Sequence, residues 1–153
     1  MRIGYVKISE LPRLSRLFRS ALVDDFRYFP RAAFEQARRD NSLPRLAASW
    51  LKPGRILAVA VEGRNVVGYS IASAEDPLRS QLYWLYVRPS HRGQGVSGQL
   101  LDFTHRQMRA QGSLLVQLVT RDFADYYAQR GYKLAGQYQI NGVDMHLMEL
   151  ALR

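Results

Sequence analysis

The sequence contains no cysteine. This absence excludes disulfide bonds, thiolate metal clusters and a covalent intermediate on a cysteine. Histidine is scarce as well, and the three that are present, His91, His105 and His146, are too scattered to suggest a metal site. No serine lies in a Gly-x-Ser-x-Gly sequence, so nothing indicates a hydrolase triad. We therefore expect no metal cofactor.

Long apolar runs are also missing. No stretch approaches the roughly 18 to 20 consecutive apolar residues that a membrane span requires, and the N-terminus lacks the apolar core of a secretion signal. We expect a soluble, cytoplasmic protein that does not enter a membrane. Apolar residues still make up 47% of the 153 positions, which is enough for one compact domain. A single domain over residues 1–153 is the expectation.

Acidic residues are few compared with basic ones. The 22 lysines and arginines exceed the 13 aspartates and glutamates, which gives a formal charge of +9. Such an excess attracts polyanions, nucleic acid among them. Nucleic-acid binding is nevertheless the less favoured interpretation, because the arginines do not share one helical face and no known binding motif accompanies them. The arginines considered for nucleic-acid binding lie in the N-terminal third of the chain. They are Arg13, Arg16, Arg19, Arg27, Arg31, Arg38, Arg39 and Arg45.

The spacing of apolar residues predicts an alternation of strands and helices. Runs rich in β-branched residues predict strands, and apolar residues three or four apart predict helices. The expected strands are residues 2–8, 56–61, 66–72, 81–87, 114–119, 132–139 and 143–150, with turns at Glu62–Asn65 and at Asn141-Gly142. The expected helices are residues 9–22, 31–39, 96–110 and 122–130, with a short one ending at Leu51.

The order of these elements defines the fold class. Summed along the chain it is βααβββαβαββ, with antiparallel hairpins first and one strand-helix-strand crossover in the middle. We therefore expect an α+β fold with a mixed, mostly antiparallel sheet of about seven strands, flanked by helices.

A glycine-rich segment stands between the fourth expected strand and the longest expected helix. Gly93, Gly95 and Gly98 have the G-x-G-x-x-G spacing of dinucleotide-binding folds. A Rossmann fold is disfavoured, because Pro89 to Arg92 separate the strand from the first glycine and too little chain remains for a second nucleotide-binding half. Glycines let the backbone wrap around a diphosphate, whose charge the helix N-terminus favours. The segment therefore predicts a phosphate-binding loop.

The stretch from Leu85 to Leu101 closely resembles the central motif of the GCN5-related N-acetyltransferase (GNAT) superfamily. That motif is an Arg or Gln, two residues, a Gly, one residue, and a Gly or Ala. Arg92 and Gly95 match it, whereas Ser97 stands where Gly or Ala is usual and is small enough to fit. Before residue 55 the resemblance rests only on the order of the elements.

The resemblance implies an acyl-CoA cosubstrate, acetyl-CoA in the simplest case, and an N-acetyltransferase acting on a primary amine by direct attack in a ternary complex. The strand before the loop would splay from its neighbour and bind pantetheine through Leu85, Tyr86 and Val87, and an amide near Val87 would stabilise the oxyanion. The residues that would hold the diphosphate are Arg92, Gly93, Gln94, Gly95, Val96, Ser97 and Gly98.

A second match runs from Asp125 to Tyr132 and resembles the late helix of the family, with a tyrosine, three residues, a glycine and an aromatic residue. Tyr127 occupies the position of the tyrosine that commonly protonates the departing thiolate, which a phenol within hydrogen-bond reach can do. Tyr127 is the first choice for the proton donor and Tyr126 the second. One of the two is expected to be a packing residue, since neighbours on a helix face different directions.

No general base follows from the sequence. Where some relatives have a glutamate on the strand after the long helix, this chain has Gln117, which cannot accept a proton. Deprotonation of the amine through water remains open, and so does the carboxylate that would receive the proton. The candidates are Glu75, Asp76, Glu35 and the pair Asp24 and Asp25.

The acceptor is not defined by the sequence beyond an amine on a small molecule or a peptide. In the superfamily the region after the first strand shapes the acceptor site, which points to Phe26, Tyr28 and Phe29, and less strongly to Trp50. A homodimer through the strand at residues 143–150 is a further expectation drawn from the resemblance. A coenzyme A-binding module without catalysis remains the alternative function.

Overall fold

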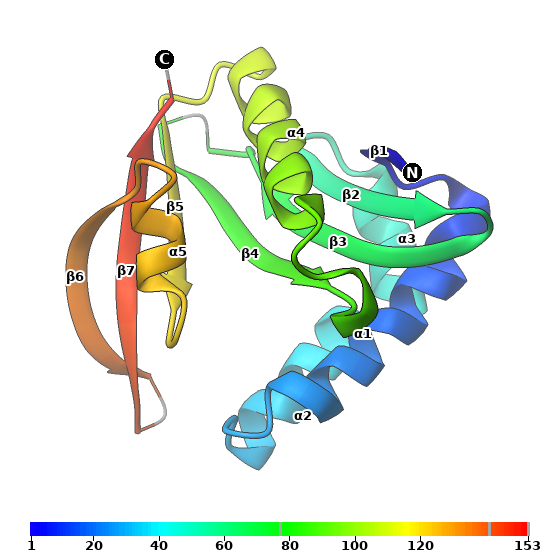
Figure 1. The fold of residues 1–153 in the computed structure, drawn as a ribbon, viewed down its shortest axis with the longest axis horizontal. Coiled ribbons are helices and arrows are strands. Elements are labelled where there is room, and N and C mark those ends of the chain that lie inside the picture. The colour runs from blue at the N-terminus through cyan, green and yellow to red at the C-terminus, as the bar shows by residue number, and fades with distance from the viewer. Residues whose placement is uncertain (77, 141, 153) are drawn as a thin grey trace.

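The computed structural model describes residues 1–76, 78–140 and 142–152. Its centre is a seven-stranded sheet with the strand order β1-β2-β3-β4-β5-β7-β6 (Figure 1). Neighbouring strands are antiparallel except for β4 and β5, which are parallel. This confirms the expected fold class. The strands are β1 (Arg2–Tyr5), β2 (Arg55–Glu62), β3 (Asn65–Ser73), β4 (Ser80–Val87), β5 (Leu115–Thr120), β6 (Lys133–Ile140) and β7 (Val143–Ala151).

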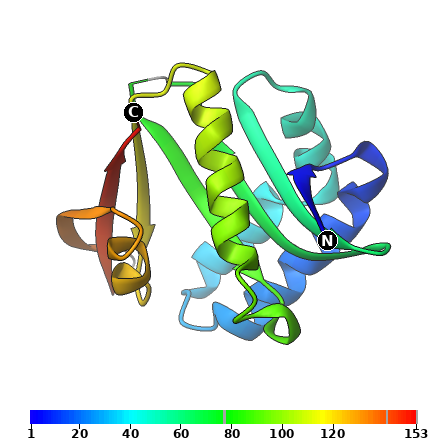
Figure 2. The same cartoon turned by 45° about the horizontal axis from the view of Figure 1, so that its top comes forward.

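Helices cover both faces of the sheet, and α4 crosses in front of the strands in Figure 2. Strand β2 shows the two faces, because Leu57 and Val59 pack in one core with α1 while Ala58 and Ala60 pack in another with α4. With both faces covered, β2 is apolar at nearly every position. The helices are α1 (Leu11–Asp25), α2 (Arg31–Asp40), α3 (Leu43–Leu51), α4 (Val96–Ala110) and α5 (Ala124–Ala128), with 3-10 turns η1 (Ile8–Glu10) and η2 (Pro89–His91).

The structure has one more helix before the first hairpin than the expected order counts. The segment ending at Leu51, expected as a short helix, forms the complete helix α3. Pro44 lies in its first turn, where a missing amide hydrogen costs nothing, and Leu46 is buried. The turn expected at Asn141 and Gly142 includes Asn141, which lies outside the described residues.

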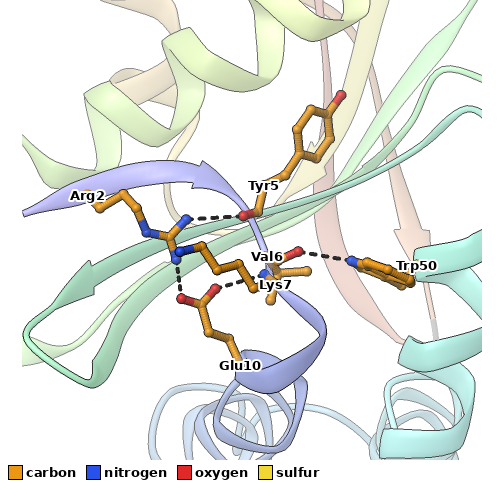
Figure 3. Close-up of polar contacts among 6 residues, drawn as sticks. All are labelled: Arg2, Tyr5, Val6, Lys7, Glu10 and Trp50. Atoms are coloured by element: carbon orange, nitrogen blue, oxygen red, sulfur yellow. Dashed lines mark hydrogen bonds and ion pairs between the residues drawn. The ribbon is translucent and has the colours of Figure 1, made fainter.

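The first strand is shorter than expected and ends at Tyr5. The carboxylate of Glu10 accepts a hydrogen bond from the amide of Lys7 at 2.8 Å and pairs with the guanidinium of Arg2 (Figure 3). Arg2 also donates to the carbonyl oxygen of Tyr5 at 3.3 Å. These contacts hold the chain where it turns out of β1 and into η1, so the strand ends before the expected residue 8.

The strand expected at a dimer interface is an interior one. It corresponds to β7, which pairs with β5 on one side and β6 on the other. The outer strands of the sheet are β1 and β6. Strand-to-strand pairing between two copies would therefore have to use one of these two edges and not β7.

Candidate active site

Strands β4 and β5 begin side by side and then separate (Figure 1). They are paired only through Ser80 with Val116 and Gln81 with Gln117. A register shift between β3 and β4 opposite Ile71 and Ala72 places Tyr83 in a bulge, which bends β4 as bulges do. The two strands border a cleft of about 750 Å³. The splayed strand that the sequence predicted is thus present.

The glycine loop, residues 92–98, lies at one rim of this cleft. Gly93 and Gly95 have φ values of +73° and +78°, which favour glycine, and a Cβ atom at either would meet no atom within 4 Å. The first amide of this region to donate within α4 is that of Gln99, to the carbonyl of Gly95 at 3.1 Å. Within the described residues, the amides from Gly93 to Gly98 donate to no other group, so they and the helix dipole are available to an anion.

Arg92 joins the glycine loop to the strand and to α1. Its Nε donates to the carbonyl of Val87 at 2.9 Å, and its Nη2 pairs with Asp25 Oδ2 at 2.6 Å. The guanidinium also lies 5.4 Å from the ring centroid of Tyr86, which stacks on Tyr69 at 5.6 Å. Burial, followed by the charge of Asp25, raises the pKa of the Tyr86 phenol. These contacts hold the guanidinium of Arg92 next to the loop amides.

Tyr127 lies inside the cleft on α5 and is 8% exposed. Burial raises the pKa of its phenol well above the usual value, and the neighbouring Tyr126 adds to the rise. A raised pKa keeps the phenol protonated, which a proton donor requires. The hydroxyl of Tyr126 donates to Ser97 Oγ at 2.7 Å.

A second part of the cleft lining is aromatic. We call Phe26, Tyr28, Phe29 and Trp84 the aromatic wall. The Trp84 ring meets Phe26 edge-on at 5.3 Å and Phe29 at 6.1 Å, and the rings of Tyr28 and Phe29 are 5.1 Å apart. Arg121, which follows β5, lies 4.3 Å from the Tyr28 ring centroid. All five residues line the cleft.

Most of the residues predicted for the site line the cleft together, and three do not. Gln94 donates to the carbonyl of Ser90 at 3.4 Å, and Gly98 lies under Arg130, whose Nη2 would be 2.9 Å from a Cβ atom there. Trp50 donates its indole N–H to the carbonyl of Val6 at 2.9 Å and fastens α3 to the chain after β1 (Figure 3). The predicted residues that line the cleft are Phe26, Tyr28, Phe29, Leu85, Tyr86, Val87, Arg92, Gly93, Gly95, Val96, Ser97 and Tyr127.

The sequence did not identify Trp84 and Arg121 as parts of the site. Trp84 lies within a strand that was expected, but the bulge that turns its ring toward Phe26 has no sequence signal. Arg121 and Tyr28 are far apart in the sequence, and only the folded structure brings them into contact. Both follow from tertiary packing rather than from any local pattern.

The carboxylates proposed as bases fall into two groups. Asp25 lines the cleft. The other candidates, Glu75, Asp76, Glu35 and Asp24, do not line it. Glu75 pairs instead with Arg55 at 2.8 Å. Gln117 donates to Glu149 of β7 and accepts from Gln81 at 3.1 Å. Gln81, Gln117 and Glu149 thus form a row across the sheet at the last residue pair of β4 and β5, before the two strands separate.

Two other features concern metals and membranes. In the described part of the chain, no three His, Asp or Glu side chains come together as a possible metal site. Across residues 1–76, 78–140 and 142–152, no helix has the length and apolar character needed to cross a membrane.

Comparisons with known proteins agree with this geometry. Residues 53–134 match the sequence profile of the acetyltransferase (GNAT) domain. No curated protein sequence matches the chain at a significant level. Among solved structures, an N-acetyltransferase named PaiA from Thermoplasma acidophilum, in complex with coenzyme A, superposes with a TM-score of 0.80 at 18% identity, covering 98% of each chain.

Two further structures have the same fold. The aminoglycoside 6'-N-acetyltransferase from Enterococcus faecium has a TM-score of 0.73 at 16% identity, covering 100% of this chain and 98% of its own. The ribosomal-protein-S18-alanine N-acetyltransferase from Escherichia coli has a TM-score of 0.72 at 16% identity, covering 99% of this chain and 93% of its own. At these identities the likeness establishes the fold.

Proposed function

Because the chain belongs to the acetyltransferase (GNAT) domain family, we propose that it transfers an acyl group, acetyl in the first instance, from acyl-CoA to a primary amine. The observation that carries this proposal is the cleft between β4 and β5, which brings the glycine loop, the separated part of β4 and Tyr127 to one space. Each of the three suits a different part of the reaction.

The glycine loop suits the diphosphate of coenzyme A. Its free amides lie at a helix N-terminus, and the guanidinium of Arg92, which is paired with Asp25, lies beside them. The part of β4 from Leu85 to Val87 lies beyond the last pair with β5, so its edge is available to the amides of pantetheine. An amide near Val87 would then polarise the thioester carbonyl.

Tyr127 suits the departure of coenzyme A. The amine nitrogen attacks the thioester carbon and forms the C–N bond, after which the C–S bond breaks and its electron pair stays on sulfur. Tyr127 donates its proton to that sulfur and recovers one from water, while the nitrogen loses one proton to water. The products are an amide and coenzyme A as the free thiol.

The route of the amine proton involves water, since the carboxylates that line the cleft are already engaged. Asp25 pairs with Arg92 at 2.6 Å and Asp122 with Arg121 at 3.6 Å. An alkylamine has a pKa of about 10.4, so it must be deprotonated before attack at neutral pH. The same engagement favours the alternative function, a protein that binds coenzyme A without turnover, which an activity assay separates from the enzyme.

The test is acetyl-CoA-dependent formation of an N-acetylated amine, followed by release of the free thiol and by mass spectrometry of the product. The variant Gly95→Glu places a carboxylate and a side chain in the glycine loop. Gly112→Glu is its matched control, because Gly112 has a φ of +84° and equally open surroundings at the other end of α4. Turnover by the wild type and by Gly112→Glu, lost in Gly95→Glu, supports the proposal. Binding of acetyl-CoA without turnover of any amine would favour the alternative.

A further inference from the structure

The aromatic wall determines the kind of acceptor that the cleft can hold. The ring centroids of Phe26 and Phe29 are 5.5 Å apart and lie 5.3 and 6.1 Å from that of Trp84. Trp84 is on β4 close to Leu85 to Val87, where the acyl group would lie under the proposed function. An acceptor that approaches the acyl carbon from this end therefore meets ring faces and edges, which bind flat apolar groups well.

The charged side chains of the cleft offer no net negative charge to a polycationic acceptor. Two acidic residues line it, and each is paired with an arginine, Asp25 with Arg92 and Asp122 with Arg121. The two acids and two arginines have no net formal charge. A polyamine would bring several ammonium groups next to these two arginines and would find no unengaged carboxylate among the described lining residues.

The contact between Arg121 and Tyr28 limits the size of the acceptor. It joins the connection between α1 and α2 to the loop after β5, with the guanidinium 4.3 Å from the ring centroid. Burial raises the pKa of the Tyr28 phenol, as does the nearby Asp122, in keeping with a ring enclosed between the two segments. A peptide chain that passed between these two segments would have to break this contact, whereas a small molecule bound on one side of it would not.

Building on the proposed function, we infer that the acceptor is a small monoamine whose amino group is attached to an aromatic body through a short alkyl chain, that is, an arylalkylamine. The ring lies against the aromatic wall and the amine reaches the thioester carbon. The amine nitrogen gains the acyl group and loses a proton, and the sulfur of coenzyme A gains one.

The inference is tested by steady-state kinetics at saturating acetyl-CoA. The amines are 2-phenylethylamine, tyramine and tryptamine, with spermidine, kanamycin and a tetrapeptide with a free N-terminus as competitors for the assignment. We expect kcat/KM for the best arylalkylamine to exceed that for each competitor by at least about 10-fold. Phe29→Ala should lower this kcat/KM about 10-fold through KM of the amine and leave KM of acetyl-CoA unchanged, and Phe29→Trp should restore most of it.

The control is Tyr138→Ala, which removes an aromatic side chain of β6 that is 43% exposed and does not line the cleft. It should leave all rates unchanged. A preference for spermidine, kanamycin or the tetrapeptide would overturn the inference while upholding the acyltransferase. Acetyl-CoA binding without turnover of any arylalkylamine would overturn it too. Absence of acetyl-CoA binding, measured by calorimetry, would instead remove the proposed function on which the inference rests.

Discussion

The two ends of the cleft are built in different ways. The glycine loop and the helix that follows it come from one continuous stretch of chain, residues 92–110. The aromatic wall is assembled from the connection between α1 and α2 and from Trp84 of β4, and it is closed by Arg121 after β5. The first end depends on backbone conformation and free amides, the second on how distant side chains pack.

This difference predicts that the two parts of the cleft tolerate substitution differently. A diphosphate is held by main-chain amides, so the geometry tolerates few changes in sequence beyond glycine and small residues. Aromatic packing tolerates many combinations of rings, so the acceptor end can change while the fold persists. The two ends should therefore respond to substitution in different measurements.

The largest effect is expected from Tyr127→Phe, which removes the hydroxyl of the proposed proton donor and keeps the ring. We expect kcat to fall about 100-fold, equivalent to roughly 2.7 kcal/mol in the activation free energy, with KM of both substrates little changed. Steady-state kinetics check this. Because burial raises the pKa of the Tyr127 phenol, the donor form persists as pH rises, so the wild type should show no loss of kcat from this group at moderately alkaline pH.

The matched control is Tyr126→Phe. Its hydroxyl already donates to Ser97 at 2.7 Å, so its loss should affect kcat far less. A larger loss of kcat in Tyr126→Phe than in Tyr127→Phe would contradict the choice of Tyr127 as proton donor and favour Tyr126.

The sequence was sufficient to predict the position of the glycine loop and the order of the elements except for helix α3, which the expected order left out. Gly93 and Gly95 mark the loop because their backbone conformation excludes most other residues. Tyr127 was chosen only because the segment from Asp125 to Tyr132 resembles the late helix of the family. The early end of β1 and the inward turn of Trp84 were not predictable, because they depend on the Glu10 contacts and on a bulge. Arg121 and Tyr28 are close only after folding, so no local pattern relates them.

A second effect concerns the support beneath Tyr127. His105 of α4 contacts the hydroxyl of Tyr132 at 2.7 Å, and the Tyr132 ring packs against Tyr127 at 5.4 Å. Burial, and then Arg109, lowers the pKa of His105 from 6.5 to about 4. Between these values the unfolded chain binds more protons than the folded one, so stability falls as pH drops from about 6.5 toward 4.

We expect the wild type to lose about 2 kcal/mol more of its unfolding free energy than His105→Gln between pH 7.5 and pH 5. Urea unfolding at the two pH values measures the difference. An equal loss in both proteins would show that protonation of His105 does not cause the fall in unfolding free energy.

The smallest effect is expected for the link between the two ends. Arg92 of the loop pairs with Asp25 at the end of α1, and both side chains are partly exposed. Exposed ion pairs contribute little, so a double-mutant cycle with Arg92→Gln and Asp25→Asn should give a coupling below about 1 kcal/mol in unfolding free energy. A much larger coupling would mean that this ion pair contributes substantially to the unfolding free energy, contrary to the expectation.

The central claim is that the glycine loop holds the diphosphate of coenzyme A. Calorimetric titration with acetyl-CoA and with NAD, at moderate salt, tests it on the wild type, Gly95→Glu and Gly112→Glu. We expect the wild type and Gly112→Glu to bind acetyl-CoA in preference to NAD. We expect Gly95→Glu to bind acetyl-CoA at least about 100-fold more weakly than the wild type does. A preference for NAD, or unchanged binding by Gly95→Glu, would contradict it.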